Sequence, residues 1–124
     1  VNSFWRFKDL PNILMVHYSD LKADLAGEMK RIAEFLKIEV ADALWPELVA
    51  AATFENMKGK ADRLAPQVGD GIWKDPEQFF NKGASGQWCD ILGTEELALY
   101  NQVMSEKIEP ELATWLEKGR LASS

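Results

Sequence analysis

The feature that most constrains the fold of this chain is one short apolar run, Asn12-Ile13-Leu14-Met15-Val16-His17-Tyr18, which follows Pro11. The run is apolar at consecutive positions, as are strands buried on both faces of a parallel sheet. Other apolar runs, such as Ile38–Val40 and Ile72-Trp73, are too short to be its neighbours. A buried strand needs partners for its N–H and C=O groups. Either the run pairs with a second copy of itself, or the rest of its sheet lies outside these residues. We favour the second arrangement.

Helical patterns account for most of the remaining chain. Three side chains are placed to cap helices by accepting a backbone N–H: Asp24, Thr53 and Thr94. Three further residues are placed to begin, break and end helices, in that order: Pro46, Pro110 and Gly119. The sequence therefore predicts a mostly α-helical chain with one main β-strand near residues 12–18.

Composition excludes several classes of partner. The 124 residues include 20 acidic and 14 basic side chains, for a net charge of −6. This balance argues against a broad basic face for nucleic acid, whereas a small anion needs only a local positive pocket. The single cysteine, Cys89, excludes an internal disulfide and suits a reducing compartment. With no apparent signal peptide, membrane span or metal-ligand spacing, we expect a cytoplasmic protein without a nucleic-acid, membrane or metal partner.

The segment best suited to bind a ligand is the glycine-rich loop Phe79-Phe80-Asn81-Lys82-Gly83-Ala84-Ser85-Gly86-Gln87-Trp88. Its two glycines, three residues apart, let the backbone turn sharply and approach a ligand closely. Backbone N–H groups, a hydroxyl and the Lys82 ammonium are the groups that a phosphate needs. The same spacing also suits a surface turn anchored by its aromatic neighbours. Spacing alone leaves both interpretations open.

Four segments, in order along the chain, resemble the C-terminal half of the cytosolic-type sulfotransferases, and they are more similar to the bacterial members. Residues 11–22 are similar to the family's strand followed by Tyr-Glu-Asp-Met-Lys, and residues 32–36 to the helix after it. Residues 53–58 resemble Thr-Ser-Phe-x-x-Met-Lys, and residues 81–88 resemble Arg-Lys-Gly-x-x-Gly-Asp-Trp. The family transfers a sulfuryl group from 3′-phosphoadenosine 5′-phosphosulfate (PAPS) to an alcohol, phenol or amine.

The resemblance implies an α/β fold, the P-loop-like sulfotransferase fold with a parallel sheet and flanking helices. Residues 1–124 are then expected to be a single C-terminal segment of that domain, without its N-terminal half. The implied partners are the nucleotide sulfuryl donor and a small-molecule acceptor, which the sequence does not name.

The resemblance also implies a nucleotide site. Lys82 and Gly83 match the loop that holds the 3′-phosphate. Other positions match residues near the adenine or elsewhere along the nucleotide: Tyr18, Thr53, Phe54, Phe79 and Phe80. Asn81 belongs to the same loop but stands where the family has an arginine. A bidentate phosphate partner is thereby lost, and a charge-assisted hydrogen bond of this kind is worth ~1.5–3 kcal/mol.

No residue of this chain matches the family's catalytic histidine or its 5′-phosphosulfate loop. The only histidine, His17, ends the apolar run and is expected to be a core or rim residue. Without a general base we expect no catalysis by this chain alone, and weak or absent binding of PAPS or 3′,5′-adenosine bisphosphate. The alternative is a non-catalytic helical interaction module that forms a homodimer through the strand at residues 13–16.

Overall fold

The computed structural model describes residues 1–64, 86, 88 and 91–123, and the chain divides into two compact units. Unit 1 joins Val1–Ile38 to Gly86–Ser124, and unit 2 is Glu39–Ser85. Among the described residues, no helix is both long enough and apolar enough to span a lipid bilayer.

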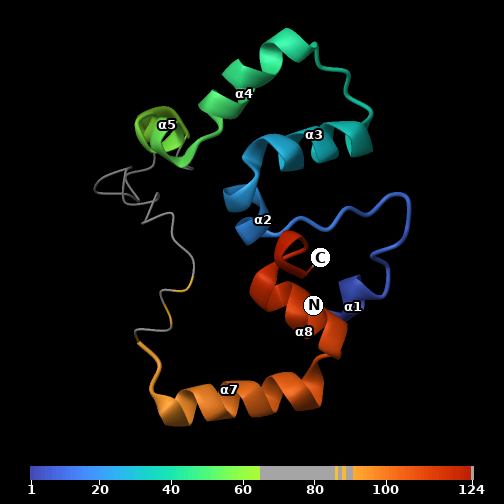
Figure 1. Ribbon diagram of the computed structural model, residues 1–124, viewed down its shortest axis with the longest axis vertical. Coiled ribbons are helices and arrows are strands. Elements are labelled where there is room, and N and C mark those ends of the chain that lie inside the picture. Colours follow the sequence, from blue (N-terminus) through green and yellow to red (C-terminus); the bar gives the residue numbers. More distant parts are fainter. Residues whose placement is uncertain (65–85, 87, 89–90, 124) are drawn as a thin grey trace. The chain divides into compact units, whose positions relative to one another are not determined.

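Unit 1 is built from helices at both ends of the chain (Figure 1). Its elements are α1 (Asn2–Trp5), α2 (Tyr18–Ala23), α3 (Leu25–Leu36), α7 (Thr94–Lys107), α8 (Pro110–Lys118) and the short 3-10 helix η5 (Leu121–Ser123). Asp24 caps α3 as predicted, because its carboxylate accepts the N–H of Gly27 at 2.8 Å. Pro110 begins α8 after α7 has ended, and Gly119 ends α8 with φ of 79°. The predicted break and stop are therefore confirmed.

The predicted cap of α7 is wrong by one residue. Gly93 has the extended backbone of a cap residue, with φ of −81° and ψ of −178°, and Thr94 is the first residue of the helix. No side chain caps this end of α7. The Thr94 side chain was expected to supply the cap because threonine is a common N-cap residue, but the backbone places the cap at glycine, which is also accepted there.

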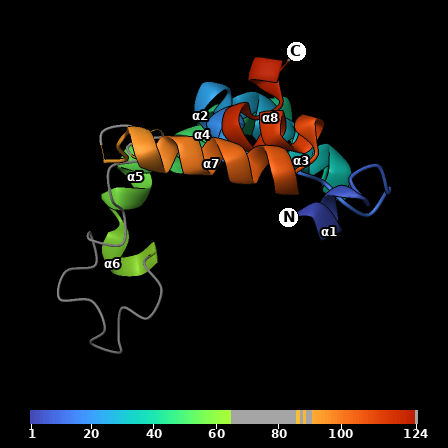
Figure 2. The same ribbon diagram turned by 90° about the horizontal axis from the view of Figure 1, so that it is seen from below.

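Unit 2 contains η1 (Asp42–Leu44), α4 (Trp45–Ala51), α5 (Phe54–Lys58) and α6 (Ala61–Leu64). Pro46 lies in the first turn of α4 and Thr53 caps α5, both as predicted. Figure 2 shows α5 and α6 following one another along the chain. A proline in the first turn thus marks the start of α4, and a threonine cap marks the start of α5.

The β-strand expected near residues 12–18 is not confirmed. The described part of the chain contains no strand, and residues 13–17 are half-buried without regular secondary structure. A strand is defined by hydrogen bonds to a neighbouring strand, and the described residues provide no such neighbour for this run. Its expected end also needs correction, since Tyr18 is the first residue of α2 and His17 is the cap of that helix.

The described core of unit 1 gathers around α8. Leu112 is fully buried, and the rings of Trp5 and Trp115 lie 5.4 Å apart between centroids. The His17 ring meets Trp115 edge to face at 5.0 Å. These contacts hold the segment before α2 against α8, so the end of α8 and the start of α2 lie together.

Candidate functional site

Three of the eight predicted nucleotide-site residues lie in the described part of the chain. Tyr18 belongs to unit 1, and Thr53 and Phe54 belong to unit 2. The other five fall outside the described residues: Phe79, Phe80, Asn81, Lys82 and Gly83. The expected phosphate loop is therefore represented only by its last residues, Gly86 and Trp88.

Tyr18 stands in the first turn of α2 with its side chain 51% exposed. Its side chain makes no hydrogen bond or ring contact with another described residue. No hydrogen bond or ring stacking with a described residue orients the Tyr18 ring, so its position depends on where the backbone at the start of α2 is held.

Thr53 and Phe54 form the start of α5. The Thr53 hydroxyl donates to the Ala50 carbonyl at 2.9 Å and accepts the N–H of Asn56 at 3.4 Å. The amide side chain of Asn56 donates to the same hydroxyl at 3.2 Å and to the Ala50 carbonyl at 2.6 Å. The hydroxyl proton and both lone pairs of Thr53 are thus used within the turn. What Thr53 can offer a ligand is the placement of the half-buried Phe54 beside it.

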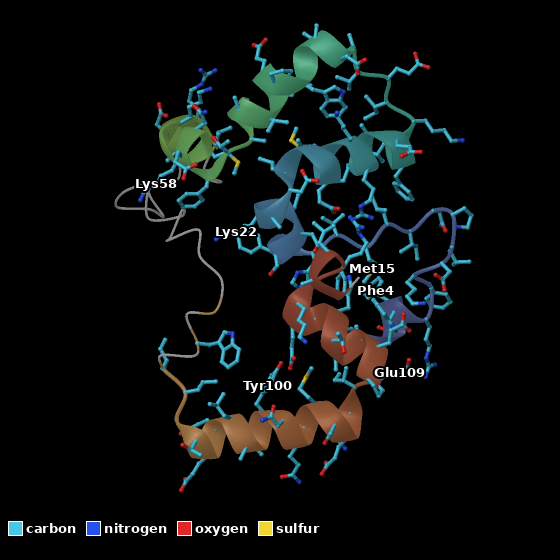
Figure 3. All side chains as sticks on the ribbon, in the orientation of Figure 1. Phe4, Met15, Lys22, Lys58, Tyr100 and Glu109 are labelled. Carbon is cyan, nitrogen blue, oxygen red and sulfur yellow. The ribbon has the colours of Figure 1, made fainter. Side chains whose placement is uncertain are left out.

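The described end of the glycine-rich loop contacts α7 through the Trp88 ring. Gly86 has φ of 78°, a left-handed conformation that glycine adopts without strain. The Trp88 ring lies 6.0 Å from that of Tyr100, within the usual range for aromatic pairs. The Tyr100 hydroxyl, on α7 (Figure 3), donates to Glu117 of α8 at 3.3 Å. Burial and the nearby Glu117 charge raise the pKa of Tyr100, so its hydroxyl keeps the proton that it donates.

Sequence reasoning missed two buried carboxylates in unit 1, Asp20 and Glu28, each only 1% exposed. Asp20 accepts the backbone N–H groups of Arg120 and Leu121 at 2.8 and 2.9 Å, one on each carboxylate oxygen. Burial alone would raise the pKa of Asp20, but the hydrogen bonds from Leu121 and Arg120, with nearby positive charge, lower it below its ordinary value. Asp20 is therefore held as a carboxylate by the residues that follow α8.

Glu28 lies between two guanidinium groups. Arg31 donates to both of its carboxylate oxygens, through Nε at 3.1 and 3.2 Å and a terminal nitrogen at 2.6 Å, and Arg120 donates at 2.6 Å. The Arg31 bonds lower the pKa of Glu28, burial opposes them, and the Arg120 bond adds to the lowering. Arg31 also donates to the backbone carbonyl of Met15 at 2.9 Å, in the segment before α2 (Figure 3).

His17 joins the same cluster. Its Nδ1 accepts the N–H of Ser19 at 3.1 Å, which assigns the ring proton to Nε2, and Nε2 donates to the Leu116 carbonyl at 3.0 Å. With both nitrogens engaged, the ring has no free lone pair to take a proton from a substrate. No local sequence pattern signals this cluster beyond the residue types, because its partners are about 100 positions apart.

A cavity of about 620 Å³ lies in unit 1 along Ile13–Met15. Trp5 and Trp115 line it with apolar surface, and Arg31 and Arg120 also contribute to its wall. The cavity thus runs beside the segment for which the sequence predicted a strand. Among the described residues, no three His, Cys, Asp or Glu side chains gather as a metal site.

Comparison with known proteins adds the family context. The profile of a family described as "Sulfotransferase domain" matches residues 1–110. A glycolipid sulfotransferase of Mycobacterium bovis is 35% identical over 120 residues, which cover 97% of this chain and 37% of that protein. Human sulfotransferase 1C2 is 24% identical over 110 residues, covering 88% of this chain and 37% of that protein.

A solved structure shows the same fold. The crystal structure of mouse sulfotransferase SULT7A1 complexed with PAP matches with a TM-score of 0.77 and 24% identity. The match covers 93% of this chain and 42% of the mouse chain. This chain therefore spans about two-fifths of the length of each of these three proteins.

Proposed function

Because this chain belongs to the sulfotransferase domain family, as the resemblance of its four segments predicted, we propose that it is the C-terminal part of a PAPS-dependent sulfotransferase. The whole enzyme would transfer the sulfuryl group of PAPS to an alcohol, phenol or amine. The observation that carries the proposal is the Lys82-Gly83 loop, which lies within the matched residues 1–110. That the mouse structure is complexed with PAP supports a nucleotide of this kind as the ligand.

In this proposal the chain supplies half of the nucleotide site. The Lys82 ammonium and the Gly83 N–H hold the 3′-phosphate, because charge-assisted donors bind phosphate most strongly. The family resemblance assigns the rings of Tyr18 and Phe54 to the adenine and Phe79, Phe80 and Asn81 to the nucleotide-binding loop. The acceptor oxygen or nitrogen attacks the sulfur in line, and 3′,5′-adenosine bisphosphate leaves.

The general base that takes the acceptor's proton would come from the part of the domain outside this chain. His17 does not suit that task, since both of its ring nitrogens are engaged. Residues 13–16 would pair with the remainder of the sheet, beside the cavity along Ile13–Met15. The chain by itself is then expected to bind nucleotide weakly or not at all, and not to catalyse.

Calorimetric titration of 3′,5′-adenosine bisphosphate into the full-length protein that contains this chain tests the proposal. We expect Lys82→Ala to weaken binding by roughly 10- to 150-fold, which corresponds to the ~1.5–3 kcal/mol of a charge-assisted hydrogen bond. Lys60→Ala, a change of the same kind at an exposed lysine, should leave the affinity within twofold. A full-length protein that does not bind, or a Lys82→Ala variant that binds equally well, would refute the site.

A second candidate function rests on the same unpaired run. Residues 13–17 are half-buried, and the described residues give them no strand partner, so an isolated chain has an edge that suits pairing with a second copy. The chain would then be a helical interaction module that dimerises through residues 13–16. Light scattering after size exclusion separates the two: a folded dimer that persists on dilution favours the module, and a monomer or aggregate favours the enzyme segment.

A further inference from the structure

Residues at and just after the end of α8 bond directly to one described element of unit 1 that the proposed nucleotide site uses, and reach a second one through the Tyr100 side chain. One element is the start of α2, which carries Tyr18. The other is the end of the glycine-rich loop at Trp88. The residues that make these bonds lie within 116–121, the last three residues of α8 and the three that follow it.

Residues at and just after the end of α8 hydrogen-bond to two residues at the start of α2, His17 and Asp20. The Leu116 carbonyl accepts from His17, the cap of α2, and Asp20 accepts the N–H groups of Arg120 and Leu121. Tyr18 lies between His17 and Asp20 in sequence. The placement of its backbone is therefore fixed by residues on either side of it, both of which are bonded to the end of α8.

The close approach of the chain at residue 119 to α2 favours glycine at that position. A Cβ placed on Gly119 would lie 2.6 Å from an Asp20 oxygen and 2.9 Å from His17 Nδ1, and the glycine has φ of 79°. The chain thus passes within contact distance of the two groups that flank Tyr18. The Arg120 side chain then reaches Glu28 of α3 at 2.6 Å and fixes the direction in which the chain leaves Gly119.

On the loop side, Glu117 accepts the Tyr100 hydroxyl, and the Tyr100 ring contacts Trp88. Trp88 is the last residue of the glycine-rich loop. The last turn of α8, whose Leu116 carbonyl accepts from the cap of α2, therefore also bonds to the Tyr100 side chain that contacts Trp88 of the loop.

We propose that residues 116–121 at the end of α8 position the nucleotide site, with Arg120 as a positioning residue that acts through Tyr18. The inference rests on the proposed nucleotide-binding function. Arg120 does not touch the nucleotide in this account. It keeps the start of α2, and with it the Tyr18 ring, in the place where the adenine binds.

A double-mutant cycle in the full-length protein tests this role, with the dissociation constant for 3′,5′-adenosine bisphosphate as the readout and circular dichroism as the check of folding. Arg120→Met keeps an unbranched apolar stem and removes the guanidinium that bonds to Glu28, which Arg31 still neutralises. We expect Arg120→Met to weaken binding at least fivefold, and Arg120→Lys to recover part of the loss. Arg6→Met, a change of an exposed arginine in the same unit, should change binding less than twofold.

Coupling to Tyr18 distinguishes a positioning role from general loosening of the fold. In the Tyr18→Ala background we expect Arg120→Met to change the dissociation constant less than twofold, because the ring that it positions is gone. An undiminished effect in that background would overturn the proposal. Gly119→Ala provides a second route to the same displacement and should show the same dependence on Tyr18, even where Arg120→Met lowers the yield of folded protein.

The two proposals fail in different ways. If the full-length protein does not bind the nucleotide, the proposed function and the positioning role both fall. If it binds, and Lys82→Ala weakens binding while Arg120→Met leaves it within twofold, the positioning role falls and the proposed function stands.

Discussion

Replacing Gly119 by alanine is the sharpest perturbation of the contacts between α8 and α2. The residue has φ of 79° and ψ of −174°, a region that side-chain-bearing residues occupy at a cost of about 1–3 kcal/mol. The new Cβ would lie 2.6 Å from an oxygen of Asp20, so the carboxylate must move away from the N–H groups that it accepts. Each hydrogen bond to a charged group contributes about 1.5–3 kcal/mol.

Taking the lower end of both ranges and the loss of one of the two bonds gives about 2.5 kcal/mol of local stability. This energy corresponds to roughly a 70-fold faster exchange of the protected amide hydrogens. Hydrogen exchange at Arg120 and Leu121 measures it directly. Gly59→Ala is the control for a glycine at negative φ, because Gly59 has φ of −64° and its new Cβ would lie 3.3 Å from the Glu55 carbonyl oxygen, well outside the 2.6 Å approach at Gly119. Unchanged exchange in Gly119→Ala would show that Asp20 does not hold these amides.

Three further outcomes follow from the same contacts. Leu112→Ala should destabilise the protein by about 2–5 kcal/mol in urea denaturation, against at most about 0.5 for Leu99→Ala, whose side chain is 61% exposed. The pKa values of Asp20 and Glu28 are lowered from 3.8 and 4.5 in the folded protein, so these carboxylates stabilise the fold fully above those values. This stabilisation is lost as the pH falls through their lower pKa values in the folded state. A urea midpoint that stays constant from pH 5 to 2 would contradict this. Asn81→Arg should tighten nucleotide binding in calorimetry, because it supplies a bidentate phosphate donor, and weaker binding would count against the loop assignment.

Local sequence signals predict several helix boundaries, although the cap of α7 lies at Gly93 rather than Thr94. Asp24 and Thr53 were recognised as caps because their side chains can accept a nearby N–H, and Pro110 and Gly119 because each restricts or frees the backbone. The end of α3 carried no such signal. Lys37 takes a left-handed conformation there, with φ of 56°, where glycine is the usual residue.

The strand and the buried charges were beyond local reasoning for physical reasons. An apolar run at residues 13–16 indicates burial, but whether it forms a strand depends on a partner that local sequence does not specify. In the sequence, Asp20 and Glu28 resemble ordinary acidic residues on a helix surface, since no neighbouring residue indicates that Arg120 will bond to them. Pairing across about 100 residues is a property of the folded chain and has no sequence period to reveal it.

Of the predicted nucleotide site, the structure describes Tyr18, Thr53 and Phe54, and it gives each a defined local setting. The phosphate-binding assignment of Lys82 and Gly83 remains a proposal that rests on the family resemblance. Thr53 was matched to the nucleotide site, but its hydroxyl makes all of its hydrogen bonds within its own turn. The hydroxyl is therefore not available to bond a nucleotide in this conformation.

The central claim is that the Lys82-Gly83 loop binds a 3′-phosphate, and comparison of two ligands tests it most directly. Affinities for 3′,5′-adenosine bisphosphate and adenosine 5′-monophosphate, which lacks the 3′-phosphate, are measured for the full-length protein and for Lys82→Ala. We expect the unaltered protein to prefer the bisphosphate at least tenfold, and we expect Lys82→Ala to reduce this preference severalfold with the monophosphate affinity unchanged. Equal affinities in the unaltered protein, or an undiminished preference in the variant, would contradict it.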